Sequence, residues 1–279
     1  MQRRRRPAGE KPFRREPTDE ASTMTEFFEM TVEAGVMHLT FTRIDRKNAM
    51  TAEMYTALAQ ALQAAEADDR VGAILFSGAG DSFSAGNDLG DFLDNPPEGL
   101  EAPLMRFVAA IMSATRPLVA AVHGHAVGIG TTLLLHCDLV YAAEDARFRT
   151  PFVDLGLCPE AGSSFLLPLL AGRQRAASAL LLGEPFDAQA AQQMGLVTEV
   201  LPHDALFVRA RDRAEALARK PRAALFETRR LVKKAWEAQL QEAFAEESAA
   251  FSRLVRGPEA REACAAFVEK RHPDRGGER

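Results

Sequence analysis

A short apolar strand that runs directly into a glycine-rich turn restricts the possible folds more than any other feature of this chain. Residues Pro117 to Val122 suit a buried strand, and the segment from Gly124 to Gly130 follows at once. A helix is expected over 131–137, so the chain passes from strand to helix across small residues. Free N–H groups at such a turn can face an anion or a developing negative charge. A tight connection whose glycines serve packing alone explains the same residues about equally well.

The flanking segments alternate strands with helices. We expect a hairpin over 27–41 that turns at Gly35, and a helix over 52–67 that begins after Thr51, a residue suited to cap it. Further strands are expected over 71–77 and 139–142, and further helices over 104–115, 163–170 and 175–182. Strands that alternate with helices at this spacing predict βαβ units in an α/β fold with a largely parallel sheet. From about Asp204 onward the chain is typical of helix.

This pattern divides the chain into three parts. We expect a disordered tail over residues 1–23, a core over 24–203 and a helical C-terminal region over 204–279. The tail begins with the basic run Arg3 to Arg6 and carries three prolines, which disfavour regular structure. An over-long start, with Met24 as the true beginning, accounts for the same composition.

Composition limits the class of protein. The chain has 279 residues, is 47% hydrophobic and carries a net charge of −5, which disfavours a nucleic-acid surface. No apolar run approaches the roughly 18 residues of a membrane helix, so no membrane partner is expected. The three cysteines lie far apart and form no CxxC pair, which favours a reducing cytoplasm over a disulfide framework. No histidine spacing typical of a metal site occurs, and we expect no metal.

A second small-residue loop, Ser84 to Asp88, also follows a strand. Gly86 permits close approach of another backbone or of a ligand, so this loop could supply a further N–H group. An ordinary turn, with Asp88 as the N-cap of the next helix, is the alternative. A dinucleotide fingerprint is disfavoured, because after Gly128 and Gly130 the third glycine is replaced by Leu133.

Glu160 is the acidic residue best placed for proton transfer. It lies between Pro159 and small residues, just before an apolar run, so burial is expected to raise its pKa. The alternative places Glu160 in the first turn of a helix after Pro159, where the helix dipole favours an acid. His136, on an expected helix among leucines, is interpreted as a core histidine whose hydrogen bonds are satisfied.

Several motifs together resemble the crotonase superfamily, also called the enoyl-CoA hydratase/isomerase family. The resemblance covers about Phe27 to Pro273 and rests on these segments: Asn48-Ala49-Met50, Phe83 to Leu89, Pro117 to Gly130, Cys137-Asp138 and Phe267 to Arg271. It implies a spiral of ββα turns, with a helical C-terminal region that mediates a homotrimer or a dimer of trimers. It also implies an acyl-CoA thioester substrate and no further cofactor, since coenzyme A belongs to the substrate.

The resemblance assigns roles to individual residues. Two oxyanion-hole N–H groups fall on Asn87 and Ile129. Contacts to coenzyme A are implied for the loop residues and for residues near the C-terminus: Ala85, Asn87, Asp88, Leu89, Phe251, Phe267 and Lys270. The acyl group is expected beside Thr132 and Phe152, and further lining residues are proposed at Phe92, Met105, Phe107 and Leu155.

Departures from the family pattern indicate the reaction. Hydratases of this family use two glutamates, which would stand at Thr132 and Phe152, and neither is acidic here. The segment Leu157 to Ser164 instead resembles the Δ3,Δ2-enoyl-CoA isomerase branch, in which one glutamate at the place of Glu160 moves the proton. This resemblance implies a step in fatty acid β-oxidation, with proton transfer from C2 to C4 of a 3-enoyl-CoA.

Two alternatives stay open. The chain could catalyse another acyl-CoA reaction, such as hydration or the degradation of a ring or branched acyl group, because one fold supports many reactions. It could also bind acyl-CoA or a partner without catalysis.

Overall fold

The computed structural model describes residues 23–24 and 27–274. The tail expected over residues 1–23 lies outside these ranges, apart from its last residue. No helix in the described part of the chain is both long and apolar enough to cross a membrane.

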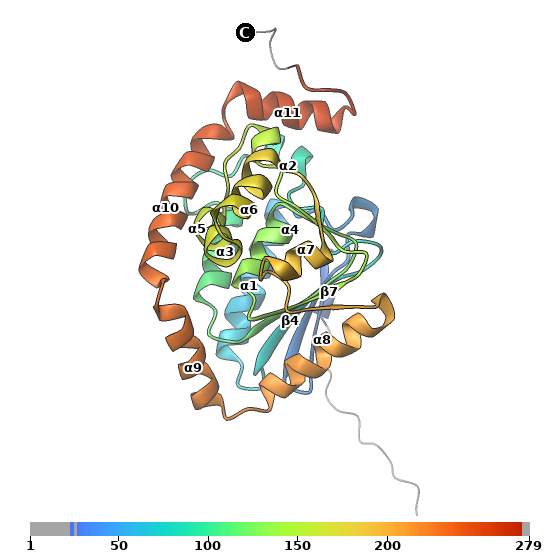
Figure 1. Ribbon diagram of the computed structural model, residues 1–279, viewed down its shortest axis with the longest axis vertical. Coiled ribbons are helices and arrows are strands. Elements are labelled where there is room, and N and C mark those ends of the chain that lie inside the picture. Colours follow the sequence, from blue (N-terminus) through green and yellow to red (C-terminus); the bar gives the residue numbers. More distant parts are fainter. Residues whose placement is uncertain (1–22, 25–26, 275–279) are drawn as a thin grey trace, which may run out of the picture.

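A twisted seven-stranded sheet forms the centre of the described structure (Figure 1). Its strands, in spatial order, are β1 (Thr23–Met24), β2 (Phe28–Glu33), β3 (Val36–Phe41), β4 (Ala73–Gly78), β5 (Leu118–Val122), β7 (Leu139–Ala143) and β10 (Glu199–Leu201). Strands β2 and β3 form the expected hairpin, with Phe28 opposite Phe41. From β3 to β10 all pairs are parallel, which confirms the largely parallel sheet.

Helices cover both faces of this sheet. Successive residues of a strand therefore pack into two different hydrophobic cores, one on each face. Val119 and Ala121 of β5 face α8 (His203–Ala218), while the neighbouring Ala120 belongs to the larger core on the other face. That larger core includes α1 (Ala52–Ala67) and α3 (Pro103–Ser113), which lie across the sheet from α8 (Figure 1). Thr51 caps α1 as expected, since its hydroxyl accepts a hydrogen bond from the N–H of Met54.

A second, three-stranded sheet was not expected. It consists of β6 (His125–Val127), β8 (Arg147–Arg149) and β9 (Phe186–Asp187), in the order β6-β8-β9. The glycine-rich turn is therefore not a direct strand-to-helix connection, because β6 intervenes. Gly124 makes this possible: its φ is +56°, and a Cβ there would lie 1.9 Å from the carbonyl oxygen of Asp81. The helix expected over 131–137 begins earlier, as α4 (Ile129–Thr132), and tightens into a 3₁₀ turn over Leu133–His136.

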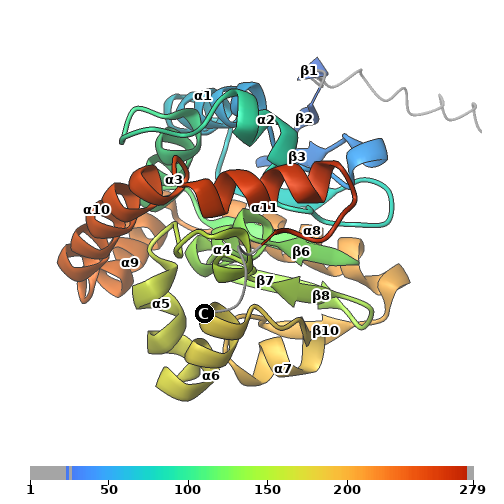
Figure 2. The same cartoon turned by 90° about the horizontal axis from the view of Figure 1, so that it is seen from above.

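The remaining helices surround this frame. They are α2 (Leu89–Asp94), α5 (Ser163–Ala171), α6 (Arg173–Ala177) with a following π turn (Ser178–Leu182), α7 (Ala188–Gln193), α9 (Arg222–Lys234), α10 (Glu237–Leu254) and α11 (Pro258–Val268), with short 3₁₀ turns at Ile44–Arg46 and Val153–Leu155. Figure 2 shows α10 and α11 folding back over the molecule, with α10 beside α5 and α11 near α2. The C-terminal helices thus reach the loops that follow the central strands. The α/β architecture and the helical C-terminal region agree with the fold class that the sequence predicts.

Candidate active site

Two backbone loops meet at the carboxyl ends of β4 and β5. The N–H of Ser84 donates to the carbonyl oxygen of His125, and the N–H of Val127 donates to that of Ser84, each at 2.9 Å. A Cβ on Gly86 would lie 2.5 Å from the carbonyl oxygen of Val127, and one on Gly130 would lie 2.8 Å from that of Ser84. The glycines therefore allow the two loops to touch backbone to backbone.

Asn87 and Ile129 each follow a glycine at this contact, because a Cβ on Gly86 would lie 3.7 Å from the Cα of Gly128. Neither N–H donates a hydrogen bond to another residue in the described part of the chain. Ile129 is fully buried and is the first residue of α4, where N–H groups lack partners within the helix. The two N–H groups can therefore donate hydrogen bonds to a negatively charged oxygen.

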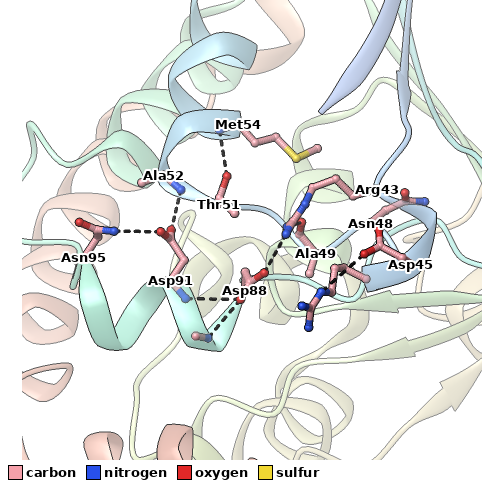
Figure 3. A network of polar contacts seen from close by, with 12 residues as sticks. Arg43, Asp45, Asn48, Ala49, Thr51, Ala52, Met54, Asp88, Asp91 and Asn95 are labelled. Atoms are coloured by element: carbon pink, nitrogen blue, oxygen red, sulfur yellow. Dashed lines mark hydrogen bonds and ion pairs between the residues drawn. The ribbon is translucent and has the colours of Figure 1, made fainter. Parts of the chain in front are cut away.

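The segment before α1 holds the first of these loops in place (Figure 3). The N–H of Met50 donates to the carbonyl oxygen of Gly86 at 2.7 Å, and the N–H of Asp88 donates back to that of Met50 at 2.9 Å. Arg43 forms an ion pair with Asp88 at 3.0 Å. The carboxylate of Asp88 also accepts from the N–H of Gly90, so Asp88 is the N-cap of α2, as the alternative interpretation of this loop proposed.

Asp91 then ties α2 to α1. Its carboxylate accepts hydrogen bonds from the N–H of Ala52 at 2.7 Å and from the side-chain amide of Asn95 at 3.0 Å (Figure 3). The loop that carries Asn87 is thus fixed at both ends, which suits a preorganised binding site.

Glu160 lies buried beside the second loop. It is 1% exposed, and Thr132 donates a hydrogen bond to its Oε1. Its Oε2 has no hydrogen-bond partner among the described residues. Burial raises the pKa of Glu160 from an ordinary 4.5 to about 8; the hydrogen bond from Thr132 opposes this rise and the charge of Glu247 adds to it. The alternative place for Glu160, in the first turn of a helix, is wrong, because α5 begins only at Ser163.

The same short helix links Glu160 to the free N–H groups. Thr132 lies three residues after Ile129 on α4, so the carboxyl group sits over the helix whose first N–H is unpaired. On the other side, Tyr55 donates a hydrogen bond to Oδ1 of Asn87. Burial raises the pKa of Tyr55 well above its ordinary value, and the charge of Glu160 contributes to that rise. The structure therefore brings Asn87, Ile129, Thr132 and Glu160 together, with Tyr55 beside them.

Sequence reasoning missed two polar residues of this region. Tyr55 lies within the apolar stripe of α1, and a buried tyrosine needs a partner for its hydroxyl. Glu247 interrupts an apolar stripe of α10 that includes Leu240, Phe244 and Phe251. The sequence signal that could have identified Glu247 is an acid at a core position of an amphipathic helix.

The residues expected around the acyl group do not all lie in one place. A cleft of about 550 Å³ opens beside α2, and Tyr55, Phe92 and Leu104 form part of its wall. Four acids also line it: Asp91, Asp94, Glu98 and Glu101. Of the expected lining residues only Phe92 borders this cleft, whereas Met105, Phe107 and Phe152 are buried elsewhere in the core and Leu155 is partly buried.

The residues expected to contact coenzyme A fall into two groups. Ala85, Asn87, Asp88 and Leu89 are all partly exposed on one loop, and Phe267 and Lys270 are exposed at the end of α11. Phe251 is fully buried, with its ring 6.2 Å from that of Phe92. Its position gives the expected coenzyme A contact no support.

Metal ligands do not gather in the described part of the chain, where no three His, Cys, Asp or Glu side chains are placed to hold an ion. The expectation that no cofactor is needed stays a prediction.

Comparison with known proteins gives consistent results. Residues 31–278 match the family model described as enoyl-CoA hydratase/isomerase. The chain is 39% identical over 237 residues to human enoyl-CoA delta isomerase 2, covering 82% of this chain and 60% of that protein. It is 36% identical over 261 residues to 1,2-epoxyphenylacetyl-CoA isomerase of Escherichia coli, covering 90% of this chain and 98% of that protein.

A solved structure of OdaA from Pseudomonas aeruginosa superposes with a TM-score of 0.84 at 43% identity, covering 88% of this chain and 99% of that one. Proteins described as hydratases also match. This chain spans little more than half the length of the delta isomerases from human and rat. The relatives therefore include more than one reaction.

Proposed function

Since the chain belongs to the enoyl-CoA hydratase/isomerase family, we propose that it is an acyl-CoA double-bond isomerase that moves a proton from C2 to C4 of a 3-enoyl-CoA. The observation that carries this proposal is the buried Glu160: its Oε2 has no partner among the described residues, and its Oε1 bonds to Thr132 on the short helix that begins at Ile129. A carboxyl group and an oxyanion site are what a proton shift next to a thioester carbonyl requires.

The proposed reaction conserves every proton. Oε2 of Glu160 removes a proton from C2, and the electrons of that C–H bond form the C2–C1 double bond of a dienolate. The thioester oxygen, now negative, accepts hydrogen bonds from the N–H groups of Asn87 and Ile129. The dienolate then takes the proton from Glu160 at C4, which leaves a C2–C3 double bond and restores the carboxylate.

The raised pKa of Glu160 suits both halves of this reaction. A carboxylate with a pKa of about 8 is a stronger base than an ordinary one, and its protonated form is well populated near neutral pH, so the same group can also serve as the acid. Thr132 fixes Oε1, so the proton-carrying oxygen is Oε2.

A single available carboxylate favours isomerisation over hydration. Thr132 and Phe152 stand where hydratases of this family would carry acids, and Phe152 is buried. Glu247, the other buried glutamate near Glu160, has both carboxylate oxygens occupied by backbone N–H groups. Water would therefore lack a second carboxylate to hold it.

A second candidate is another acyl-CoA reaction on the same site, since 1,2-epoxyphenylacetyl-CoA isomerase matches this chain over almost its full length. Incubation with 3-hexenoyl-CoA and, separately, with 2-hexenoyl-CoA distinguishes the two. We expect conjugated 2-enoyl product from the first thioester and little hydration of the second. Hydration of the second with no conversion of the first would overturn the proposal, and binding of both without turnover would leave only a reaction on another acyl group or a non-catalytic protein.

A further inference from the structure

The peptide group between Ala161 and Gly162, one residue after Glu160, is held at both of its ends. The carbonyl oxygen of Ala161 lies 2.7 Å from Nε2 of His136, and the N–H of Gly162 donates to Oε2 of Glu247 at 2.6 Å. All of these residues are buried. The two side chains come from opposite sides, His136 from the turn that continues α4 and Glu247 from α10.

The backbone here needs such support. Ala161 has a φ of +59° and Gly162 a φ of +69°, so two consecutive residues adopt the left-handed conformation. A residue with a Cβ, such as Ala161, keeps this conformation only where the surroundings hold it. A Cβ on Gly162 would lie 2.3 Å from a methyl group of Leu240, which shows how closely α10 packs on this point.

Glu247 also replaces the missing cap of α5. The N-cap residue of α5 is Gly162, which has no side chain to accept from the first N–H groups. The second oxygen of Glu247 accepts from the N–H of Ser164 at 2.8 Å, so one carboxylate satisfies the N–H of the N-cap residue and one of the first N–H groups of the helix. A residue 85 positions further along the chain thereby fixes the start of the helix that follows Glu160.

His136 fixes the same peptide to the oxyanion side of the site. Burial lowers the pKa of His136 to about 4, so the ring is neutral near pH 7. A carbonyl oxygen can only accept a hydrogen bond, so Nε2 of His136 carries the proton and donates a hydrogen bond to the carbonyl oxygen of Ala161. The turn that bears His136 continues directly from the helix that bears Ile129 and Thr132.

We propose that His136 and Glu247 are positioning residues, which clamp the Ala161–Gly162 peptide and so hold Oε2 of Glu160 at the reacting carbons. This inference rests on the proposed function, because it concerns the proton that Glu160 moves. Since a misplacement of about 1 Å can lower a rate about a hundredfold, loss of either clamp should act on the chemical step.

The test uses four variants of the full chain: Glu247→Gln, His136→Leu, His136→Gln and, as a matched control, Glu246→Gln on the exposed face of the same helix. In Glu247→Gln an NH₂ group faces one of the two backbone N–H groups and cannot accept its hydrogen bond. In His136→Leu the donor to the carbonyl oxygen of Ala161 is removed. Glutamine at 136 restores an N–H donor. For each variant kcat and KM are measured with 3-hexenoyl-CoA, and amide hydrogen exchange is followed over residues 157–164.

We expect kcat to fall about tenfold to a hundredfold in Glu247→Gln and His136→Leu, with KM within about threefold of the wild type. The variant His136→Gln should recover most of the rate, and Glu246→Gln should match the wild type. Faster exchange over 157–164 with kcat unchanged would overturn the positioning role and leave the proposed function intact. If Glu247→Gln does not fold, the two His136 variants decide by the same criterion.

A wild-type protein that leaves 3-hexenoyl-CoA unconverted overturns the proposed function instead, and this is seen before any variant is compared.

Discussion

Glu160 and Glu247 are both buried glutamates near one loop, yet the protein surrounds them differently. Glu247 accepts hydrogen bonds from two backbone N–H groups, one on each oxygen. Glu160 accepts from Thr132 on Oε1 alone, and its Oε2 has no partner in the described structure. Burial raises the pKa of both carboxyl groups, and the hydrogen bonds that Glu247 accepts from Gly162 and Ser164 oppose this rise.

The difference shows that burial alone does not mark a proton-transferring acid. A buried carboxylate with every oxygen bonded stabilises the backbone that surrounds it. One that keeps an oxygen unpaired is destabilised when ionised, and it can exchange a proton with a bound molecule. We therefore assign a structural role to Glu247 and a chemical role to Glu160.

The largest expected effect separates the two residues by activity. Glu160→Gln removes the proposed base and should lower kcat for 3-hexenoyl-CoA by about 10²- to 10⁴-fold, the usual contribution of general acid–base catalysis. Binding of hexanoyl-CoA, measured by calorimetry, should stay within about threefold of the wild type. A variant that retained more than a tenth of the wild-type rate would show that another group moves the proton.

The free energy of unfolding should change in opposite directions when Glu160 and Glu247 are replaced. Because the pKa of Glu160 is raised in the folded state, the folded protein binds more protons than the unfolded chain between pH 4.5 and about 8, and stability is lost as pH rises through this range. Glu160→Gln should remove that loss, so its advantage over the wild type should grow by on the order of 3 kcal/mol from pH 5 to pH 8. Glu247→Gln should instead destabilise by about 1–3 kcal/mol, since it disrupts the pairing of buried N–H groups.

Urea unfolding of both variants at several pH values measures these changes. Equal destabilisation by the two substitutions at pH 8 would remove the distinction between them.

A smaller effect is expected at the hydrogen bond that the carboxyl group of Glu160 accepts from Thr132. The Thr132 hydroxyl lowers the pKa of Glu160, so Thr132→Val should raise that pKa further and reduce the ionised fraction at pH 7. We expect kcat/KM at pH 7 to fall about tenfold for each unit of that rise, with recovery at higher pH. Thr132→Ser, which keeps the hydroxyl, is the control, and an equal loss in both variants would indicate a packing effect.

The smallest expected effect concerns the acyl chain. Tyr55, which bonds to Asn87, also lines the cleft beside Phe92, together with four acids. A 3-enoyl chain that enters this cleft and ends in a carboxylate should therefore bind more weakly than 3-hexenoyl-CoA. We expect KM to be a few-fold higher at low salt and the difference to shrink as salt screens the charges. Glu101→Gln should reduce the difference; an equal KM for both thioesters would show that the chain end lies elsewhere.

The locally encoded parts of the fold could be predicted from the sequence. Thr51 and the apolar spacing after it define α1, and Gly35 defines the turn of the first hairpin. Strands β6, β8 and β9 have only two or three residues each, so they show no periodicity and depend on partners far along the chain. The second sheet was therefore missed.

The site shows the same limit. Apolar neighbours identified Glu160 as a candidate, and the resemblance to the crotonase family assigned the two N–H groups to Asn87 and Ile129. In the structure the two loops pair at Ser84 and Ala126, and Glu160 bonds to Thr132 on the helix that begins at Ile129. The orientation of Glu160 could not be predicted, because the role of capping α5 falls to Glu247, which comes from a helix near the other end of the chain. The sequence around Glu160 does not show that an acid from a helix far along the chain caps α5 in its place.

The central claim is that Glu160 acts as a base with a strongly raised pKa. The pH dependence of kcat/KM for 3-hexenoyl-CoA tests it most directly, because that ratio reports the ionisation of the free enzyme. Since the base must be ionised, we predict that kcat/KM rises with pH through an apparent pKa near 8 in the wild type and loses this dependence in Glu160→Gln. A rise centred near the ordinary value of 4.5, or the same profile in the variant, would contradict the account.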